Sequence, residues 1–319
     1  MWSYLVRRII QAIFTLVIIT VVCFTLTRLS ADPMAQYANR PGLTAEDKER
    51  IRKQLGLDQP LPVQYVRWLG LALQGELGTS FFSKQPVSDL IRQRLPMTLI
   101  LMLTAEVITV TISLFFGVIS AVKQYSLTDN IITIASFIGY SMPIFFVALG
   151  LMLIFSVQFQ AWGLPNLPTG ADIWDPKNPG ELIQHMILPV TCLVIITTAG
   201  YSRFLRSSIL EVLGQDYVRT ARAKGLTERA VVYKHTLRNA ILPFVTLIGL
   251  DIPFLIGGAL VTESVYAWPG MGRLFWEYAQ RGDFPVVNGV LLLVSTFVVF
   301  FTIVVDMLYT FIDPRIRLS

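Results

Sequence analysis

Six long apolar segments constrain this chain more than any other feature of its sequence. A helix needs roughly 20 predominantly apolar residues to cross the hydrocarbon core of a bilayer. Only 15% of the 319 residues are charged and 54% are hydrophobic, whereas about a quarter of a typical soluble domain is charged. The sequence therefore predicts an all-α, polytopic membrane protein with six transmembrane helices, at about Ile9–Leu29, Met97–Val122, Ile131–Phe159, Met186–Tyr201, Ile241–Thr262 and Val286–Thr310.

The first segment resembles a secretory signal peptide in outline, because Arg7 and Arg8 precede its apolar run. However, the run Ile9–Leu26 is longer than the roughly 7–15 residues of a signal peptide's hydrophobic region. No small-x-small cleavage site follows it. We therefore expect a retained first transmembrane helix.

Prolines and glycines predict that two of the segments are not simple straight helices. The third contains Pro143, which should kink it, and the fifth contains Pro253 followed by Gly257, which should bend it or pack it closely. Membrane helices tolerate such residues when neighbouring helices satisfy the freed backbone groups. The fourth segment is the shortest, and we expect it to continue into an extension that carries Arg203 and Arg206.

Lysine and arginine are distributed very unevenly over the connecting segments. If the N-terminus is cytoplasmic, the inside segments hold thirteen of these residues and the two short outside loops hold three. This asymmetry predicts that both termini are cytoplasmic. The resulting division is an N-terminal tail and first helix (1–29), an extracytoplasmic helical segment (30–96), a core of five helices (97–310) with a cytoplasmic loop (202–240), and a C-terminal tail (311–319).

The extracytoplasmic segment should contain two short helices. Thr44 followed by Glu46 and Asp47 is typical of a helix start, and Gly56 supplies the stop. A second helix is expected at Val63–Leu73, which is rich in aromatic residues. Two interpretations stay open, a cap on the membrane surface and a direct ligand site, and the first is favoured.

The loop at 202–240 contains two helical stretches around a glycine. One is expected at Ile209–Lys224 and ends at Gly225, and the other begins after Thr227 as N-cap and reaches Asn239. Positive charge beside anionic lipid headgroups would explain a basic loop. A helix–glycine–helix unit with internal apolar positions instead indicates docking into a groove of another protein.

The residues of this loop carry a family resemblance. Asp216-Tyr217-Val218-Arg219-Thr220-Ala221-Arg222-Ala223-Lys224-Gly225-Leu226, followed by His235-x-x-Arg238-Asn239-Ala240-x-x-Pro243, resembles the cytoplasmic coupling loop of ATP-binding-cassette importer permeases. More narrowly, it is similar to the membrane subunit of the oligopeptide/dipeptide permease family. Further matches cover nearly the whole chain in order: Leu55-Gly56-Leu57-Asp58-Gln59-Pro60, Gly75-Glu76-Leu77-Gly78-Thr79-Ser80, Gly139-Tyr140-Ser141-Met142-Pro143, Trp268-Pro269-Gly270-Met271-Gly272, Asp283-Phe284-Pro285 and Asp313-Pro314-Arg315.

The resemblance implies a type I importer permease fold and assigns the loop a role. In this family the loop helix docks in a cleft of a separate ATPase subunit. The broad superfamily motif opens with Glu-Ala-Ala where this chain has Arg219-Thr220-Ala221, so Arg219 is not given the acidic role of that motif. The implied ATPase-coupling residues are Tyr217, Arg219, Thr220, Ala221, Arg222, Ala223, Lys224 and Gly225.

The resemblance also implies partners that this chain does not contain. They are a second homologous permease chain, two ATP-binding-cassette ATPase subunits, an extracytoplasmic substrate-binding protein and membrane lipid, with no nucleic acid. ATP and Mg would bind to the partner ATPase, because this chain has no G-x-x-x-x-G-K-[ST] phosphate loop. The chain is expected to be non-catalytic, to need no cofactor or metal of its own, and to lie in the bacterial plasma (inner) membrane.

The implied function is half of the translocation pathway for di- and oligopeptides. Alternatives with the same architecture carry nickel chelates or glutathione. A stand-alone secondary transporter would work without an ATPase, and the coupling loop argues against it. An intramembrane enzyme would need a catalytic motif such as H-E-x-x-H, which the sequence does not contain.

Four further residues are candidates for the pathway or its gate. Glu106 and Asp251 are carboxylates within apolar segments, where burying a charge costs free energy. Such a residue either lies on a translocation pathway or forms hydrogen bonds between helices. Pro143 lies at the expected kink. Glu263 precedes Trp268 at the outer mouth, where it would form a gate, contact the binding protein or belong to an interfacial aromatic turn.

Overall fold

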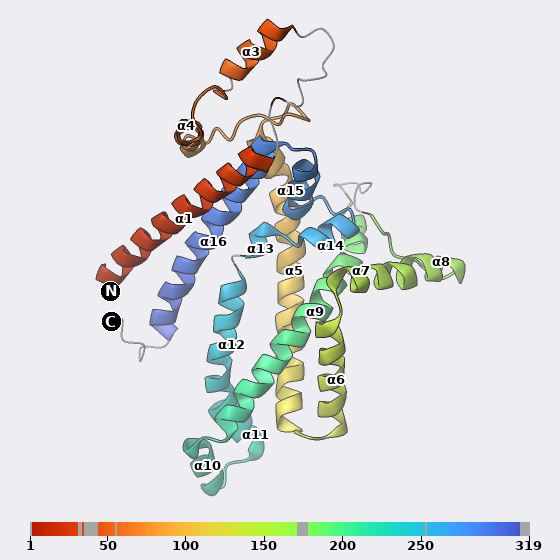
Figure 1. The fold of residues 1–319 in the computed structure, drawn as a ribbon. Coiled ribbons are helices and arrows are strands. Elements are labelled where there is room, and N and C mark those ends of the chain that lie inside the picture. The colour runs from red at the N-terminus through yellow and green to blue at the C-terminus, as the bar shows by residue number, and fades with distance from the viewer. Residues whose placement is uncertain are drawn as a thin grey trace.

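The protein is built from helices in the computed structural model, as predicted (Figure 1). Within the described residues there is no strand, and Thr79 and Pro86 form an isolated β-bridge. Pro253 and most of the predicted tail at 311–319 lie outside the described part. The structure describes residues 2–30, 34, 44–54, 56–170, 178–252 and 254–312.

Long helices alternate with short ones along the chain. The elements are α1 (Trp2–Ser30), α3 (Ala45–Gln54), α4 (Leu61–Leu73), α5 (Val87–Val122), α6 (Leu127–Ser141), α7 (Ile144–Met152), the π-helix η1 (Leu153–Gln158), α8 (Phe159–Ala161), α9 (Pro179–Leu213), α10 (Asp216–Ala223), α11 (Glu228–Ala230), the π-helix η2 (Val231–Thr236), α12 (Leu237–Asp251), α13 (Phe254–Gly257), α14 (Leu260–Val265), α15 (Met271–Gln280) and α16 (Phe284–Ile312).

Five helical stretches in the described residues are long and apolar enough to cross a membrane. Length and composition confirm the all-α, polytopic class, while the count of six crossings stays a prediction. The five stretches are Val6–Leu29, Val87–Val122, Ile144–Ala161, Pro179–Leu213 and Phe284–Val305.

Helices α5 and α9 form the centre of the bundle and pack along much of their length (Figure 1). Leu101 and Ala105 of α5 are buried against Val190 of α9. Nearer the other end, Gly117 lets the two helices approach closely, because a Cβ at that position would lie 2.9 Å from the side chain of Leu205. Leu205 lies in α9 shortly before residues Asp216–Gly225, the segment that resembles the coupling loop and is called the coupling motif below.

The central helices extend beyond their predicted bounds. Helix α5 begins at Val87, well before the predicted start, and α9 runs for 35 residues. The prediction that the fourth segment is the shortest is wrong, because hydropathy counts only apolar residues and the Asn178 side chain caps a helix that begins earlier. The predicted extension through Arg203 and Arg206 is confirmed.

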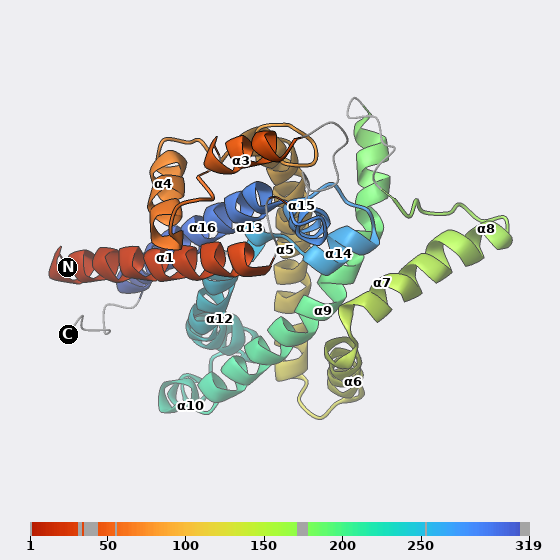
Figure 2. The same cartoon turned by 45° about the horizontal axis from the view of Figure 1, so that its top comes forward.

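The third apolar segment is broken rather than kinked. Helix α6 ends at Ser141, and Pro143 is the N-cap of α7 with an extended backbone (φ −59°, ψ 136°). A proline disfavours helical geometry in the residue before it, and Met142 is accordingly extended. The two helices therefore run in clearly different directions (Figures 1 and 2).

The fifth segment, which was predicted to bend or to pack closely, is interrupted. Helix α12 ends at Asp251, and the short α13 and α14 follow it. Gly258 lies between α13 and α14 and has φ +75°, a conformation that residues with a side chain rarely adopt. This interruption places α14 across the end of the bundle (Figure 1).

Helices α1 and α16 lie side by side along one flank (Figures 1 and 2). The hydroxyl of Thr27 donates to Oδ1 of Asn288 at 2.9 Å. Large apolar side chains of α1 stay exposed, including Phe14 at 68% and Leu26 at 58%. An apolar surface of this kind is suited to lipid contact.

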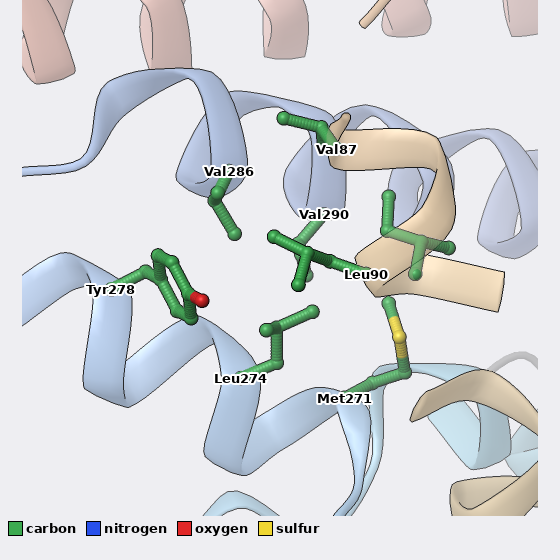
Figure 3. Close-up of a cluster of buried hydrophobic side chains, with 8 residues drawn as sticks. Val87, Leu90, Met271, Leu274, Tyr278, Val286 and Val290 are labelled. Carbon is green, nitrogen blue, oxygen red and sulfur yellow. The ribbon is translucent and has the colours of Figure 1, made fainter. Parts of the chain in front are cut away.

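A buried cluster joins α5, α15 and α16 (Figure 3). It lies at the end of the bundle where α4 also lies, which we call the α4 end (Figure 1). The opposite end, which carries α10, is called the α10 end. The cluster comprises Val87, Leu90, Ile91, Met271, Leu274, Tyr278, Val286 and Val290. It packs the start of α5 against α15 and the start of α16.

Both helices expected in the 30–96 segment are present as α3 and α4. The hydroxyl of Thr44 accepts from the backbone N–H of Asp47 at 3.2 Å, which confirms the predicted N-cap. Gly56 follows α3 with φ +66°. The last residues of the segment, from Val87, form the start of α5, and its end at residue 96 stays a prediction.

Candidate functional site

The coupling motif forms a separate short helix. Helix α9 ends at Leu213, Gly214 and Gln215 follow, and α10 then runs over Asp216–Ala223. The single helix predicted at Ile209–Lys224 is therefore wrong. Glycine weakens a helix interior, and Gln215 is extended with ψ 148°.

One side of α10 packs against its own chain. Val218 and Ala221 are buried against Val231 of η2, next to the last turn of α9. The apolar residues Tyr217 and Leu226 remain 44% and 43% exposed. The Tyr217 hydroxyl nevertheless accepts from Nδ2 of Asn239 at 2.8 Å and so joins α10 to α12.

The other side of α10 is exposed and basic. It contains Arg219, Thr220, Arg222, Ala223 and Lys224, which are all exposed. Because the apolar side is already occupied within the chain, this exposed side is the one available for contact with another protein.

A glycine turn and an ion pair brace the end of α10. Gly225 has φ +77°, and its N–H donates to the carbonyl of Arg222 at 2.9 Å. The Arg222 guanidinium contacts Oε1 of Glu228 at 2.6 Å, and its hydrogen bonds lower the pKa of that carboxyl. Thr227 caps the next helix through the N–H of Ala230, as predicted.

The second loop helix continues directly into the bundle. From Glu228 the chain runs through α11, η2 and α12 to Asp251 with helical backbone at each junction. The sequence interpretation ended this helix at Asn239. The change from a basic to an apolar composition at Ile241 suggested the start of a separate helix. The signal for one continuous helix was that no glycine or proline lies between Thr227 and Pro243.

A buried ion pair holds the α10 end of the bundle together. Asp129 of α6 is 2% exposed, and its carboxylate accepts from Nε and Nη2 of Arg206 at 2.9 and 2.8 Å. It also accepts from the N–H of Tyr125 at 2.9 Å and from the Ser120 hydroxyl. The pair joins the α5–α6 turn to α9 shortly before α10.

The sequence interpretation did not identify this pair. The available signal was Ser126 three residues before Asp129, since the Ser126 hydroxyl accepts from the N–H of Asp129 at 3.2 Å. That spacing is typical of a helix N-terminus and says nothing about a distant arginine.

Two of the candidate pathway residues meet inside the bundle. The hydroxyl of Tyr201 lies 2.5 Å from Oδ2 of Asp251 and 3.2 Å from Oε1 of Glu106. These residues come from α9, α12 and α5. A phenol has one proton and can donate it to only one carboxylate at a time. Tyr201 was missed because one tyrosine in an apolar segment carries no pattern of its own.

Glu263 is completely buried at the α4 end. Its carboxylate accepts from the Thr98 hydroxyl at 2.8 Å and from the N–H of Arg273 at 3.0 Å. Gly270 lies so close that an added Cβ would collide with this carboxylate. Glu263 therefore organises the turn between α14 and α15.

Trp268 is buried in the same turn and donates to the carbonyl of Met97 at 3.0 Å. Pro143 is exposed at the start of α7. Within the described part of the chain, neither Pro143 nor Glu263 shares a hydrogen bond with the group of Glu106, Tyr201 and Asp251.

Removing the Tyr201 hydroxyl should destabilise the bundle. Tyr201→Phe keeps the ring, which packs edge-on against Phe244 at 5.5 Å, but leaves the Asp251 carboxyl without its donor. A lost buried hydrogen bond costs about 1–3 kcal/mol. Thermal unfolding in detergent should show a lower midpoint, whereas Tyr233→Phe, at a position 58% exposed, should leave it unchanged. Equal midpoints for both variants would contradict this role.

The fold and the loop define a class of protein, a helical membrane component of a transport system. Residues 113–318 match the family described as binding-protein-dependent transport system inner membrane component, and residues 1–102 match the N-terminal family of the same components. The chain belongs to this family of inner membrane transport components.

Curated relatives match over almost their full lengths. The oligopeptide transport system permease protein AppB of Bacillus subtilis is 42% identical, over 99% of this chain and 100% of its own length. The dipeptide transport system permease protein DppB of Escherichia coli K12 is 37% identical, over 99% of both chains. The glutathione transport system permease protein GsiC of Salmonella paratyphi A is 40% identical, over 99% of both.

A solved structure supports the fold. The crystal structure of an amino acid ABC transporter with histidines aligns with a TM-score of 0.53, over 70% of this chain and 94% of that chain. The identity is 16%, so this similarity concerns the fold alone.

Proposed function

We propose that this chain is the membrane permease subunit of an ATP-driven importer and forms half of its translocation pathway. The observation that carries the proposal is α10, a short helix with one side packed on its own chain and a basic side exposed. The resemblance implies that this helix docks in a cleft of a separate ATPase subunit, and membership of the family supports that role. The contact would be made by Tyr217, Arg219, Thr220, Arg222, Ala223, Lys224 and Gly225. Ala221, which the resemblance also implies, is instead buried against Val231 of the same chain.

The covalent and packing connections of α10 suit it to transmit motion. It follows α9 after two residues, and its buried side rests on η2, which is continuous with α12. The Arg222–Glu228 pair and the Tyr217–Asn239 hydrogen bond add contacts between α10 and the segments that follow it. If the cleft of the ATPase subunit moved, α10 would therefore move α9 and α12 together as rigid bodies.

The proposed orientation places the α10 end in the cytoplasm, with the start of α1 and the end of α16. The excess of lysine and arginine in the segments of that end supports this. The α4 end would then face an extracytoplasmic substrate-binding protein. A second homologous permease and two ATPase subunits would complete the complex, and ATP and Mg would bind only to the latter.

We propose di- and oligopeptides as the cargo. Support comes from the relatives named as oligopeptide and dipeptide permeases. Glutathione, a tripeptide, is the alternative cargo, because one relative is named as a glutathione permease. Glu106 and Asp251 are proposed to lie on the pathway, where their shared contact with Tyr201 would hold them in position.

Reconstitution tests the proposal. The chain should be assembled in proteoliposomes with its permease partner, ATPase subunits and binding protein, and uptake of a labelled dipeptide measured. Uptake should require hydrolysable ATP and should stop when ATP is replaced by a non-hydrolysable analogue. Uptake driven by an ion gradient in the absence of ATP would contradict the importer and favour a stand-alone secondary transporter.

A further inference from the structure

A cavity of about 240 Å³ lies between the C-terminal part of α1 and helix α4. Figure 2 shows α4 beside that part of α1. The polar residues that matter for its chemistry are Arg28 of α1 and Gln64, Arg67 and Trp68 of α4. Neither the loop that carries the coupling motif nor the carboxylates of the bundle contribute to it.

Packed side chains fix the walls of this cavity. The Thr20 and Tyr65 hydroxyls are hydrogen-bonded at 2.9 Å across α1 and α4. Phe24 is 1% exposed, and its ring centroid lies 5.7 Å from that of Tyr65 and 5.4 Å from that of Trp68. The Arg28 guanidinium lies over the Phe24 ring at 5.3 Å. The arginine is therefore oriented by its surroundings.

Three polar atoms at the cavity are buried without a hydrogen-bond partner among the described residues. They are Nε of Arg28, Nε1 of Trp68 and Oε1 of Gln64. The first two are donors and the third is an acceptor. An unsatisfied buried polar group is costly, so each of these atoms is suited to a ligand that supplies the complementary group.

The charge of the cavity is positive. Arg28 and Arg67 line it, and none of its described lining residues is acidic. The described part of the chain provides neither arginine with an ion pair. The cavity therefore presents two cations and an indole N–H to one small volume, which favours an anion with several acceptor oxygens.

Apolar surfaces flank this cationic volume. Two of the residues that line the cavity on α4 are apolar and exposed, Val63 at 50% and Leu71 at 40%. Such side chains contact acyl chains, while arginine and tryptophan are typical of the headgroup level. The cavity thus combines an anion site with adjacent surface for hydrocarbon.

We propose that this cavity binds the headgroup of an anionic phospholipid of the phosphatidylglycerol class. Arg28, Arg67 and Trp68 donate to the phosphate oxygens. Gln64 accepts from a hydroxyl of the headgroup glycerol, which explains why an acceptor lies among the donors. The acyl chains rest on the apolar surface of α4 beside the cavity, formed by Val63 and Leu71. Because Arg28 belongs to α1 and Arg67 to α4, the bound headgroup joins the two helices.

Native mass spectrometry of the full-length chain in detergent tests this proposal. Phosphatidylglycerol, phosphatidylethanolamine and phosphatidylcholine are titrated separately. One phosphatidylglycerol should bind preferentially, and Arg28→Gln and Trp68→Phe should each weaken it by about tenfold, the effect of one lost charge-assisted hydrogen bond. Trp68→Phe keeps an aromatic ring against Phe24 and so separates loss of the donor from loss of packing. Arg52→Gln on α3 removes the same charge outside the cavity and should leave binding unchanged.

Three results would overturn the proposal. The first is equal binding of phosphatidylglycerol and phosphatidylcholine. The second is an equal loss on Arg52→Gln, which would show general attraction to positive charge. The third is inorganic phosphate that binds as tightly as the lipid and displaces it, which would make the cavity a site for free phosphate.

Discussion

Replacing Ala223 by aspartate should abolish ATP-driven uptake while the chain stays folded in the membrane. Ala223 lies on the exposed side of α10, and surface substitutions of this kind change stability by about 0.5 kcal/mol or less. In a docked complex the same carboxylate would be buried without a partner, at a cost of about 3–5 kcal/mol. Dipeptide uptake by the reconstituted complex should therefore fall by about a hundredfold or more.

Two companion variants make this result specific. Ala223→Ser keeps a small neutral side chain and should transport normally. Gly225→Pro should uncouple by a different route, because proline cannot adopt the φ of +77° and lacks the N–H that donates to the carbonyl of Arg222. Normal uptake by both Ala223→Asp and Gly225→Pro would show that α10 is not the coupling element.

Asp129→Asn should lower the free energy of unfolding more than Tyr201→Phe does. The amide removes the negative charge that faces the Arg206 guanidinium and turns one acceptor into a donor. Arg206 is 24% exposed, so its charge is mostly removed from water. Breaking a buried pair by removing one partner costs about 3–5 kcal/mol, and we expect about 3 kcal/mol here because of that residual exposure. The thermal unfolding midpoint in detergent should fall clearly.

An exposed ion pair in the same region is the matched control. Arg219 and Asp216 lie 3.4 Å apart, with side chains 71% and 97% exposed. Asp216→Asn should therefore change the free energy of unfolding by about 1 kcal/mol or less. Equal unfolding temperatures for Asp129→Asn and Asp216→Asn would show that the Asp129–Arg206 pair does not stabilise the α10 end.

Features that depend on local chemistry were predictable from the sequence. The apolar segments, the N-caps at Thr44 and Thr227, and the stop at Gly225 each follow from residues close together in the chain. The coupling motif was recognisable for the same reason, since its residues are contiguous.

Features that depend on distant residues were not predictable. Pro143 indicated a distortion, but the sequence did not show that the chain divides there into two separate helices, α6 and α7, which both pack on α9. Asp129 with Arg206, and Tyr201 with Asp251, lie far apart in the chain and meet only through the folded bundle. One sequence contains no signal for such pairs beyond the residue types themselves.

The contact of α10 with an ATPase subunit is the central claim, and site-specific cross-linking tests it most directly. A photoreactive amino acid at position 223 should form an adduct with the ATPase subunit in the assembled complex. The same group at position 66 of α4, where Val66 is 67% exposed, should form none. Cross-linking to the ATPase from position 66, or its absence from position 223 in a complex that transports normally, would contradict the account.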